Sequence, residues 1–337
     1  MKTIRKKSQP LRDFSWSTKK EKTLGEKLVE NTVKEWYEAK HRKQSKDEIK
    51  FINSQKLDTC PYCGSHNFYK SGKTSNGIQR FFCHDCSKRF NVLTGTIFDS
   101  KKIPISEWIE FLLHLFEFHS IKSSSFDNRN AETTGKFWLQ KVFLVLKDVQ
   151  NDVVLSGDVY IDEKFFSVIY KDIIKKDGKA LRGISKNKNC VATGLCEDCS
   201  FFIQTNASKL DETTSFKAYG KHIKPGSHLI HDREKAHNVL IEKLNLESSA
   251  YDPADYKDVP DNKNPLNPIN QVHRILKMFM DAHGGYNRKQ LQDWLNLFWF
   301  ISNGPKDKYD KALLFIELAI KKRKKLRFRE CFKKNDD

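Results

Sequence analysis

The chain has 337 residues, 38% of them hydrophobic, which is enough for two or three domains and at least one full core. No apolar run approaches the roughly 20 residues that cross a bilayer, which excludes an integral membrane protein. The first residues lead into polar sequence rather than into the apolar core of a signal peptide, which predicts a cytoplasmic protein. The 61 lysines and arginines against 43 acidic residues, a formal charge of +18, favour nucleic acid as the partner over an anionic membrane or a generic basic surface.

Residues 1–55 are basic and polar and contain one expected helix. Between Leu24 and His41 four apolar side chains fall on one helical face, which is typical of a small helix that packs on another element. These side chains are Leu28, Val33, Trp36 and Tyr37. A role in contacting DNA is the alternative for this helix.

A zinc ribbon is predicted over residues 56–92. Cys60 and Cys63 form one CxxC pair, and Cys83 and Cys86 form a second pair after nineteen intervening residues. Each pair makes a tight turn that aims two sulfurs at one point, and four thiolates complete a tetrahedral zinc site. In an intracellular chain this spacing favours a metal over a disulfide, with a redox dithiol as the alternative. Metal binding would supply much of the folding energy of so small a ribbon.

Basic residues of the ribbon are the candidate DNA contacts in this region. They are Lys70, Lys73, Arg80, Lys88 and Arg89. The cysteines themselves do not distinguish a DNA partner from a protein partner, so this assignment rests on charge.

Residues 93–150 are expected to form a helical DNA-binding segment. A first helix, with Ser106 as its N-cap, carries an apolar stripe that belongs to a core. After a polar break, a second helix from Ala131 to Leu146 is expected to turn inward the side chains of Phe137, Leu139, Val142, Phe143 and Leu146. Its outward residues are expected to be Thr133, Thr134, Lys136, Gln140 and Lys141. Two helices about a short polar segment suit a helix-turn-helix, whose last helix reads the major groove, although ordinary three-helix packings share this pattern.

The pattern then changes to strands, which predicts a ribonuclease-H-like α/β domain over residues 151–305. The stretch Gly157 to Glu163 alternates apolar residues before an acidic pair, and two further strands, a helix and a fourth strand ending at Asp232 follow it. In this order the first and fourth strands are neighbours, so Asp162 and Asp232 are expected to face each other and to hold a divalent cation. Glu163 is expected on the opposite face of a regular strand.

Other polar residues of this domain leave alternatives open. Three neighbours of Asp232 compete for an assisting role, namely His231, Glu234 and His237. Cys196 and Cys199 form a third CxxC without a second pair nearby, which favours a hairpin turn over a zinc site.

A further helix is expected from Asn267 to Lys277. Its buried face is marked by an apolar stripe of Ile269, Val272, Leu276 and Phe279. Asn270, Arg274 and Lys277 recur at i, i+4 and i+7 on another face, which offers one oxygen ligand and two cations, with a solvated surface as the alternative. Residues 306–337 end with the basic run from Lys321 to Arg329, which either binds DNA or solvates a helix end.

Taken together, these residues resemble the DDE transposases of bacterial insertion sequences, in the zinc-ribbon-bearing group related to the Merlin transposons. The resemblance runs from about Cys60 to Asn303, most of the chain. Its markers, in the order of the family, are CPYC with CHDC, GTIFDSKKIPISEW, a strand ending IDE, a strand ending HD, INQVHRILK and LFWFISN. The order of several motifs is more specific than any one of them.

The resemblance implies a set of catalytic residues. The first two metal ligands fall on Asp162 and Asp232, the third on Asn270, and the downstream basic residue on Lys277. Many transposases have glutamate at the third position, so Asn270 offers a neutral carbonyl oxygen and leaves the cations with one acidic ligand fewer.

The resemblance also implies the reaction and its partners. The enzyme would bind the terminal inverted repeats of its element and target DNA, and would use Mg²⁺ or Mn²⁺ for strand cleavage and strand transfer, with Zn²⁺ as a structural ion. It would act as a homo-oligomer in the bacterial cytoplasm, associated with the nucleoid. The main rival is a catalytically inactive or domesticated zinc-ribbon DNA-binding protein. A zinc-ribbon transcription factor would leave the strands of Asp162 and Asp232 unexplained.

Overall fold

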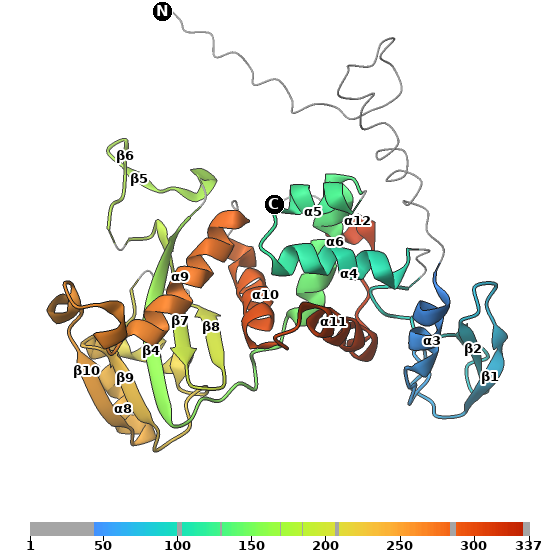
Figure 1. The fold of residues 1–337 in the computed structure, drawn as a ribbon, viewed down its shortest axis with the longest axis horizontal. Helices are drawn as coiled ribbons and strands as arrows, with labels where there is room; N and C mark the ends of the chain where they lie inside the picture. The colour runs from blue at the N-terminus through green and yellow to red at the C-terminus, as the bar shows by residue number, and fades with distance from the viewer. Residues whose placement is uncertain are drawn as a thin grey trace, which may run out of the picture. The chain divides into compact units, whose positions relative to one another are not determined.

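The computed structural model describes residues 44–99, 103–128, 130–168, 170–183, 185–205, 209–283 and 288–332, and Figure 1 shows how their helices and strands follow one another. The helix expected between Leu24 and His41 lies outside these residues. In the described part of the chain, no helix is both long enough and apolar enough to cross a membrane.

The first described elements are a short helix and a small antiparallel sheet. Their bounds are Lys46–Ser54 for α3, Phe68–Lys73 for β1, Gln79–Cys83 for β2 and Arg89–Phe90 for β3. The strands lie in the order β1-β2-β3, with Phe68 opposite Cys83 and Phe81 opposite Phe90. These three phenylalanines pack around the cysteines in a core of their own. The two strands expected between the cysteine pairs are therefore confirmed.

Three helices follow where two were expected. They are α4 at Ile105–Phe116, α5 at Ile121–Asp127 and α6 at Glu132–Leu146. The prediction that Ser106 caps the first helix is wrong, because α4 begins at Ile105 and Pro104 occupies the N-cap position. The Ile105 amide instead donates to Glu48 Oε1 of α3 at 2.7 Å, so a residue from a distant helix satisfies the first turn. Helix α5 was not predicted, since its seven residues are too few to show a period.

Helix α6 is buried on more sides than the sequence indicated. The expected inward residues are buried, and Trp138 and Val145 are buried with them. Lys141 was predicted to face outward, and this prediction is wrong: it is 2% exposed, and its Nζ donates to the Ile97 carbonyl. A long aliphatic stem lets the lysine head reach that carbonyl from inside the core. Of the α6 residues predicted to contact DNA, Thr133 and Lys136 are exposed, and both lie in the first turns of the helix.

The second half of the chain is a mixed α/β structure built on a five-stranded mixed sheet. Its strands are Asp158–Ser167 for β4, Lys188–Leu195 for β7, Ser200–Gln204 for β8, His228–Asp232 for β9 and Glu247–Tyr251 for β10. They lie in the order β10-β9-β4-β7-β8. β9 is parallel to β4 and to β10, whereas β7 is antiparallel to β4 and to β8. The fourth large strand thus returns beside the first, as predicted.

Helices cover both faces of this sheet. Their bounds are Glu212–Tyr219 for α7, Asn238–Leu244 for α8, Asn267–Ala282 for α9 and Leu291–Asn303 for α10. On one face, Val159 and Ile161 of β4 pack against Tyr219 of α7 and Leu240 of α8. On the other face, Ile230 of β9 packs against Ile269 of α9, and α9 crosses this face of the sheet in Figure 1. Successive residues of β4 therefore point to different helices.

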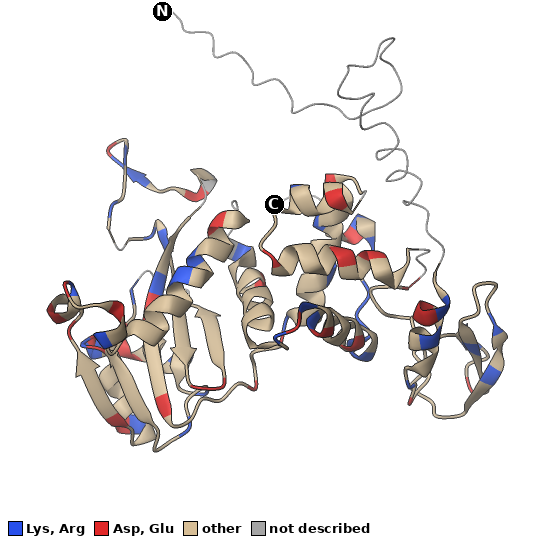
Figure 2. Ribbon diagram, in the orientation of Figure 1, with Lys and Arg blue, Asp and Glu red and all other residues tan. Residues whose placement is uncertain are grey.

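The remaining elements are a hairpin, two C-terminal helices and several 3₁₀ turns. The hairpin strands are Lys175–Lys176 for β5 and Lys179–Ala180 for β6, and the helices are Lys308–Lys322 for α11 and Phe328–Cys331 for α12. The turns are Tyr170–Asp172, Lys235–His237, Pro253–Tyr256, Asp261–Lys263 and Arg288–Gln290. Figure 2 shows lysine and arginine on the hairpin, on α9 and on the small N-terminal sheet.

One hydrophobic core joins α4 and α6 to α9, α10, α11 and the strands β4, β7 and β8 of the large sheet. Polar bonds reinforce the junction, since Asn296 of α10 accepts from Gln150 Nε2 at 2.7 Å and donates to the Lys147 carbonyl at 2.8 Å. The basic C-terminal run also bonds to its own chain. Lys322 donates to the Val145 carbonyl, Arg323 to the Thr94 carbonyl, and Lys325 pairs with Asp99.

Candidate active site and zinc centre

The four ribbon cysteines converge on one point. Their sulfurs all lie within 4.8 Å of one another, with Cys60 Sγ 3.7 Å from Cys86 Sγ and Cys63 Sγ 3.6 Å from Cys83 Sγ. Although burial alone raises it, hydrogen bonds from the Cys86 backbone and from Cys63 lower the pKa of the Cys83 thiol to about 7. Against a backbone hydrogen bond from Ser65, burial and the neighbouring thiols raise the pKa of Cys63 to about 12, so the fit to tetrahedral zinc rests on the convergence of the four sulfurs.

The two cysteine turns have matching backbone geometry. The amide of Gly64 donates to the Cys60 carbonyl at 2.9 Å, and the amide of Ser87 donates to the Cys83 carbonyl at 3.0 Å. Both residues have positive φ, 76° at Gly64 and 54° at Ser87. A serine in this left-handed conformation is strained by roughly 1 kcal/mol, which is tolerated where the turn must aim two sulfurs inward.

Asp162 and Asp232 lie at corresponding positions of neighbouring parallel strands. Ile161 pairs with His231 in the register of β4 and β9, and each aspartate is the next residue along its strand. Ile230, two residues before Asp232, packs on α9, so both aspartates belong to the α9 face. The sequence predicted this juxtaposition, and the register of the sheet produces it.

Among the described residues of α9, His273 contacts Asp162. Its Nδ1 lies 3.3 Å from Asp162 Oδ2, and its side chain is 4% exposed. It belongs to the buried side of α9 together with Ile269 and Leu276. His273 was not predicted as a site residue, although a histidine three residues before a buried leucine and four after a buried isoleucine has the spacing of an inward position.

The α9 residues that the sequence did single out lie on the exposed side of the helix. Asn270, Arg274 and Lys277 are all exposed. Lys277 Nζ pairs with Asp281 Oδ2 at 2.7 Å, one helical turn further on. These side chains form the outer surface of the helix that covers the aspartates, and none of their described contacts is with Asp162 or Asp232.

A second polar cluster lies beneath the aspartates, on the α7 and α8 face. Glu163 Oε1 accepts from the Tyr219 hydroxyl at 2.6 Å and lies 3.1 Å from His237 Nε2. His237 Nδ1 in turn lies 3.5 Å from Asp232 Oδ1 and 3.1 Å from His231 Nδ1. Glu163 therefore points away from Asp162, as predicted, and His237 connects Glu163 to Asp232.

The members of this cluster differ in the direction of their pKa shifts: the pKa values of Asp232 and His237 are raised, and that of His231 is lowered. Burial raises the pKa of Asp232, and the Asp162 charge raises it further, against the opposing effect of His237. Burial lowers the pKa of His237, but the hydrogen bond and charge of Glu163 outweigh burial and raise it overall. Burial and the neighbouring His237 lower the pKa of His231 to about 4. A protonated His237 between two carboxylates, beside a neutral His231, is the arrangement these shifts favour.

The α9 face offers donors of the types that bind divalent cations, although Asp162, Asp232 and His273 are not among the described groups whose ligand atoms all lie within 4.8 Å of one another. It combines two carboxylates on adjacent strands with an imidazole nitrogen within 3.3 Å of one of them. In the described part of the chain, ligand atoms also gather at His231, Asp232 and His237, and at His114, His119 and Asp127 between α4 and α5.

The candidate DNA contacts lie mostly on the surface. Lys70, Lys88 and Arg89 of the ribbon are exposed, while Arg80 is half-buried. Lys88 Nζ stands over the Tyr62 ring, 4.8 Å from its centre. On α6, Thr134 is half-buried, and Lys136 pairs with Glu132 at 2.7 Å.

Cys196 and Cys199 close the turn between β7 and β8, as predicted, with the Cys196 amide donating to the Cys199 carbonyl at 2.9 Å.

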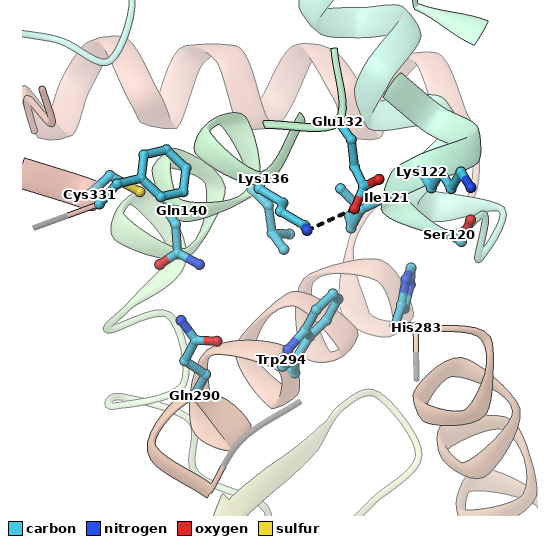
Figure 3. Close-up of a pocket in the computed structure, with 12 residues that line it drawn as sticks. Ser120, Ile121, Lys122, Glu132, Lys136, Gln140, His283, Gln290, Trp294 and Cys331 are labelled. Atoms are coloured by element: carbon cyan, nitrogen blue, oxygen red, sulfur yellow. Dashed lines mark ion pairs between the residues drawn. The ribbon is translucent and has the colours of Figure 1, made fainter. Parts of the chain in front are cut away.

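A cavity of about 510 Å³ lies between α6 and α10. Figure 3 shows His283 and Trp294 along one wall and Lys136 with Glu132 along the other. His283 stacks on Trp294 with ring centres 4.7 Å apart, and burial lowers its pKa to about 4. This cavity contains none of the predicted metal ligands.

In comparisons with known proteins, neither a protein-family model nor a curated protein matches this chain. Two similar solved structures are the Mos1 mariner paired-end complex with Mn and the Mos1 strand transfer complex, each 12% identical over 66% of this chain. They are covered over 78% and 77% of their own lengths, with TM-scores of 0.28 and 0.26. Similarity of this size does not define a family, so the interpretation of the site rests on the chain's own geometry.

Proposed function

We propose that this chain is a DNA transposase that binds the ends of its insertion sequence and carries out metal-dependent strand cleavage and strand transfer. The observation that carries the proposal is the placement of Asp162 and Asp232 at corresponding positions of β4 and β9, on the face covered by α9. The strand order β10-β9-β4-β7-β8, with only β7 antiparallel to its neighbours, is the order of a ribonuclease-H-like domain.

Asp162 and Asp232 would hold divalent cations, Mg²⁺ or Mn²⁺, on this face. Bound there, such ions stabilise the attacking and leaving oxygens of an in-line displacement at a phosphodiester. Asp162 is fixed by its strand, and its Oδ1 accepts from the Glu163 amide at 2.7 Å. Asp232 is held from below by His237. The chain's own contribution is thus two carboxylates whose positions are set before DNA arrives.

The exposed face of α9 would contact the DNA backbone. Arg274 and Lys277 are cations one turn apart, and Asn270 precedes them on the same face. For Asn270 to complete the ligand set, its exposed side chain would turn toward the aspartates once DNA phosphate had joined the site, and Lys277 would hold a phosphate near the cut. Water would cleave at the transposon end, and the freed 3′-hydroxyl would then attack target DNA at the same aspartates.

The remaining regions would bind and order the DNA. The ribbon, residues 56–92, would be held by Zn²⁺ at its four cysteines and would present Lys70, Arg80, Lys88 and Arg89 to duplex phosphates. Residues 93–150 would contribute Thr133, Thr134 and Lys136 at the start of α6. We propose that two or more copies act together on paired ends in the bacterial nucleoid, with the catalytic domain at 151–305 and a basic C-terminal region at 306–337.

The test is a cleavage assay with matched variants. Purified chain is incubated with Mg²⁺ or Mn²⁺ and a supercoiled plasmid that carries the inverted repeats flanking its gene. Asp162→Asn and Asp232→Asn should reduce cleavage to the level seen without protein, because each removes a charged ligand. Asp158→Asn is the control, since Asp158 lies four residues earlier on the same strand with a 69% exposed side chain.

Equal cleavage by the wild type and both ligand variants would refute the enzyme proposal. Normal binding to the repeats without cleavage by any protein would establish the rival, a catalytically inactive DNA-binding protein.

A further inference from the structure

We propose that His114, His119 and Asp127 form a second metal site, which takes Zn²⁺ and holds the end of α4 against the end of α5. Each of the three side chains offers one ligand atom, and these atoms all lie within 4.8 Å of one another. The site shares no residue with the zinc ribbon or with the proposed catalytic aspartates, and it does not depend on the proposed function.

The backbone at the end of α4 brings the two histidines together. The His119 amide donates to the His114 carbonyl at 2.9 Å, and the Phe118 amide donates to the Leu115 carbonyl at 3.1 Å. Phe118 has a left-handed φ of 63°. These are the features of a Schellman ending, in which the side chains at the positions of His114 and His119 frequently make an apolar contact. Two imidazoles occupy these positions instead, so the turn pairs two metal-binding side chains.

The distances between the donor atoms suit a tetrahedral ion. His114 Nδ1 lies 2.9 Å from His119 Nδ1 and 3.8 Å from Asp127 Oδ2. Two donors bound at about 2.0 to 2.1 Å with a tetrahedral angle are separated by roughly 3.3 Å, which lies between these distances. The three side chains are 27% to 39% exposed, so they can turn to equalise the separations, and an ion can reach them from solvent.

Polar groups lie where the outer shell of a metal site is expected. Glu117 Oε2 lies 3.9 Å from His119 Nε2, within the range of an ion pair. Ser123 Oγ donates to Asp127 Oδ2 at 3.3 Å. A histidine that binds metal through one ring nitrogen usually directs the other at a carboxylate or a carbonyl, and ligating carboxylates are themselves hydrogen-bonded. The position of Glu117 therefore favours Nδ1 as the ligand atom of His119.

The types of donor determine which cation is favoured. Two imidazole nitrogens and one carboxylate oxygen are the donor set of a three-ligand zinc site, whose fourth position is left for water. Mg²⁺ and Ca²⁺ prefer oxygen ligands, whereas imidazole suits zinc and other later first-row ions. This site should therefore take Zn²⁺ in preference to the ions proposed for the aspartate pair.

Bound zinc would fix α5 on α4. Asp127 is the last residue of α5, a helix of only seven residues, and so short a helix depends on tertiary contacts. The next residue, Asn128, already bonds back to α4, since its Nδ2 donates to the Glu107 carbonyl at 2.9 Å. An ion shared by Asp127 and the two histidines would add a second connection at the same end of α5.

The competing interpretation is a hydrogen bond between two imidazoles. Their rings are tilted by 37°, and one Nδ1–H can donate to the other Nδ1 at 2.9 Å without any ion. In that case the chain would bind no zinc here, and Asp127→Asn would change nothing that depends on zinc. A metal site behaves differently, because Asp127→Asn removes its charged ligand.

The experiment measures the zinc bound per chain by equilibrium dialysis and metal analysis, over a series of free Zn²⁺ concentrations. All proteins are the full chain with the ribbon already loaded with zinc. The series is the wild type, His114→Gln, His119→Gln and Asp127→Asn. His228→Gln is the control, because His228 also pairs with an aspartate, Asp158 at 2.9 Å, but belongs to none of the described three-ligand groups. Circular dichroism verifies that each variant is folded.

The wild type and the control should bind about one zinc ion more per chain than each of the three ligand variants. Each ligand variant should bind this ion at least roughly tenfold more weakly. Equal zinc binding by the wild type and the three variants would overturn the proposal. Loss of zinc in the histidine variants with none in Asp127→Asn would overturn the three-residue site.

Hydrogen exchange on the same proteins tests the connection between the helices. Adding zinc to the ribbon-loaded wild type should slow exchange at the amides of residues 117–128, and it should have no such effect in the three ligand variants. Zinc that binds through all three residues without slowing exchange in this range would refute the role of the ion in holding α5 on α4.

Discussion

The pH dependence of stability should contain a measurable contribution from His283. This residue ends α9, is 9% exposed, and stacks on Trp294 at 4.7 Å. Within the described residues neither of its ring nitrogens has a hydrogen-bond partner. Burial lowers its pKa from the ordinary 6.5 to about 4. The folded chain thus keeps the imidazole neutral at a pH where the unfolded chain protonates it.

The magnitude follows from these two pKa values. Unfolding takes up a proton below pH 6.5, so acid favours the unfolded state, and the loss of stability is complete only below about pH 4. Between pH 8 and pH 5.5 the contribution of this one group is about 1.4 kcal/mol of unfolding free energy, at 1.36 kcal/mol per pKa unit.

The perturbation is His283→Phe, which preserves an aromatic ring against Trp294 and removes the titrating group. Guanidinium unfolding at pH 8 and at pH 5.5 gives the free energy of unfolding at each pH for the wild type and the variant. The wild type should lose about 1.4 kcal/mol more than His283→Phe on acidification. His84→Gln, at an exposed position, serves as the control and should lose as much as the wild type.

Equal losses in the wild type and His283→Phe would refute the reasoning. They would mean that the imidazole is already solvated or hydrogen-bonded in the folded chain, and that the wall of the cavity in Figure 3 is open to water at this residue.

Three further outcomes are expected from the packing and the zinc centre. Cys83→Ser should lose the bound zinc, about one ion per chain by metal analysis, and should make residues 56–92 sensitive to protease, whereas Cys190→Ser should keep it. Gly135→Ala should destabilise the fold by about 1 to 3 kcal/mol in a denaturant titration, because its Cβ would lie 1.8 Å from Ser125 Oγ; an unchanged midpoint would contradict the described packing of α5 on α6. Glu163→Gln should lower the free energy of unfolding by about 3 kcal/mol at pH 6, because it leaves the protonated His237 buried without this carboxylate. The loss should be smaller at pH 9, because the pKa of His237 is raised and its charge disappears as pH rises through that value. A loss that is the same at both pH values would show that His237 is neutral throughout.

Features set by short stretches of sequence were predictable. The cysteine spacing identifies both turns of the four-cysteine cluster, and the alternation in Gly157 to Glu163 correctly assigns Asp162 and Glu163 to opposite faces. The neighbouring positions of Asp162 and Asp232 were also accessible, because strand order follows from the sequence of elements. In each case the information lies within a few residues or in a topological rule.

Features that depend on distant partners were not predictable. The cap of α4 comes from Glu48, so the nearest serine was a misleading signal. Lys141 appears polar and external in the sequence, yet inside the core the Ile97 carbonyl accepts a hydrogen bond from its Nζ. His273 sits in an apolar stripe that was interpreted only as packing, and its importance appears when β4 brings Asp162 opposite it.

Because Asp162 and Glu163 are adjacent, the apolar residues of β4 determine which of the two carboxylates lies on the face of the proposed metal site. If β4 slipped by one residue against β9, Glu163 would take the position under α9 and Asp162 would enter the pocket of Tyr219. That slip would also turn Val159 and Ile161 out of the core beneath the sheet. The choice between the two carboxylates is therefore determined by two aliphatic side chains on the opposite face of the sheet from Asp162. Substitutions that weaken their burial would exchange one acid for the other without altering either acid.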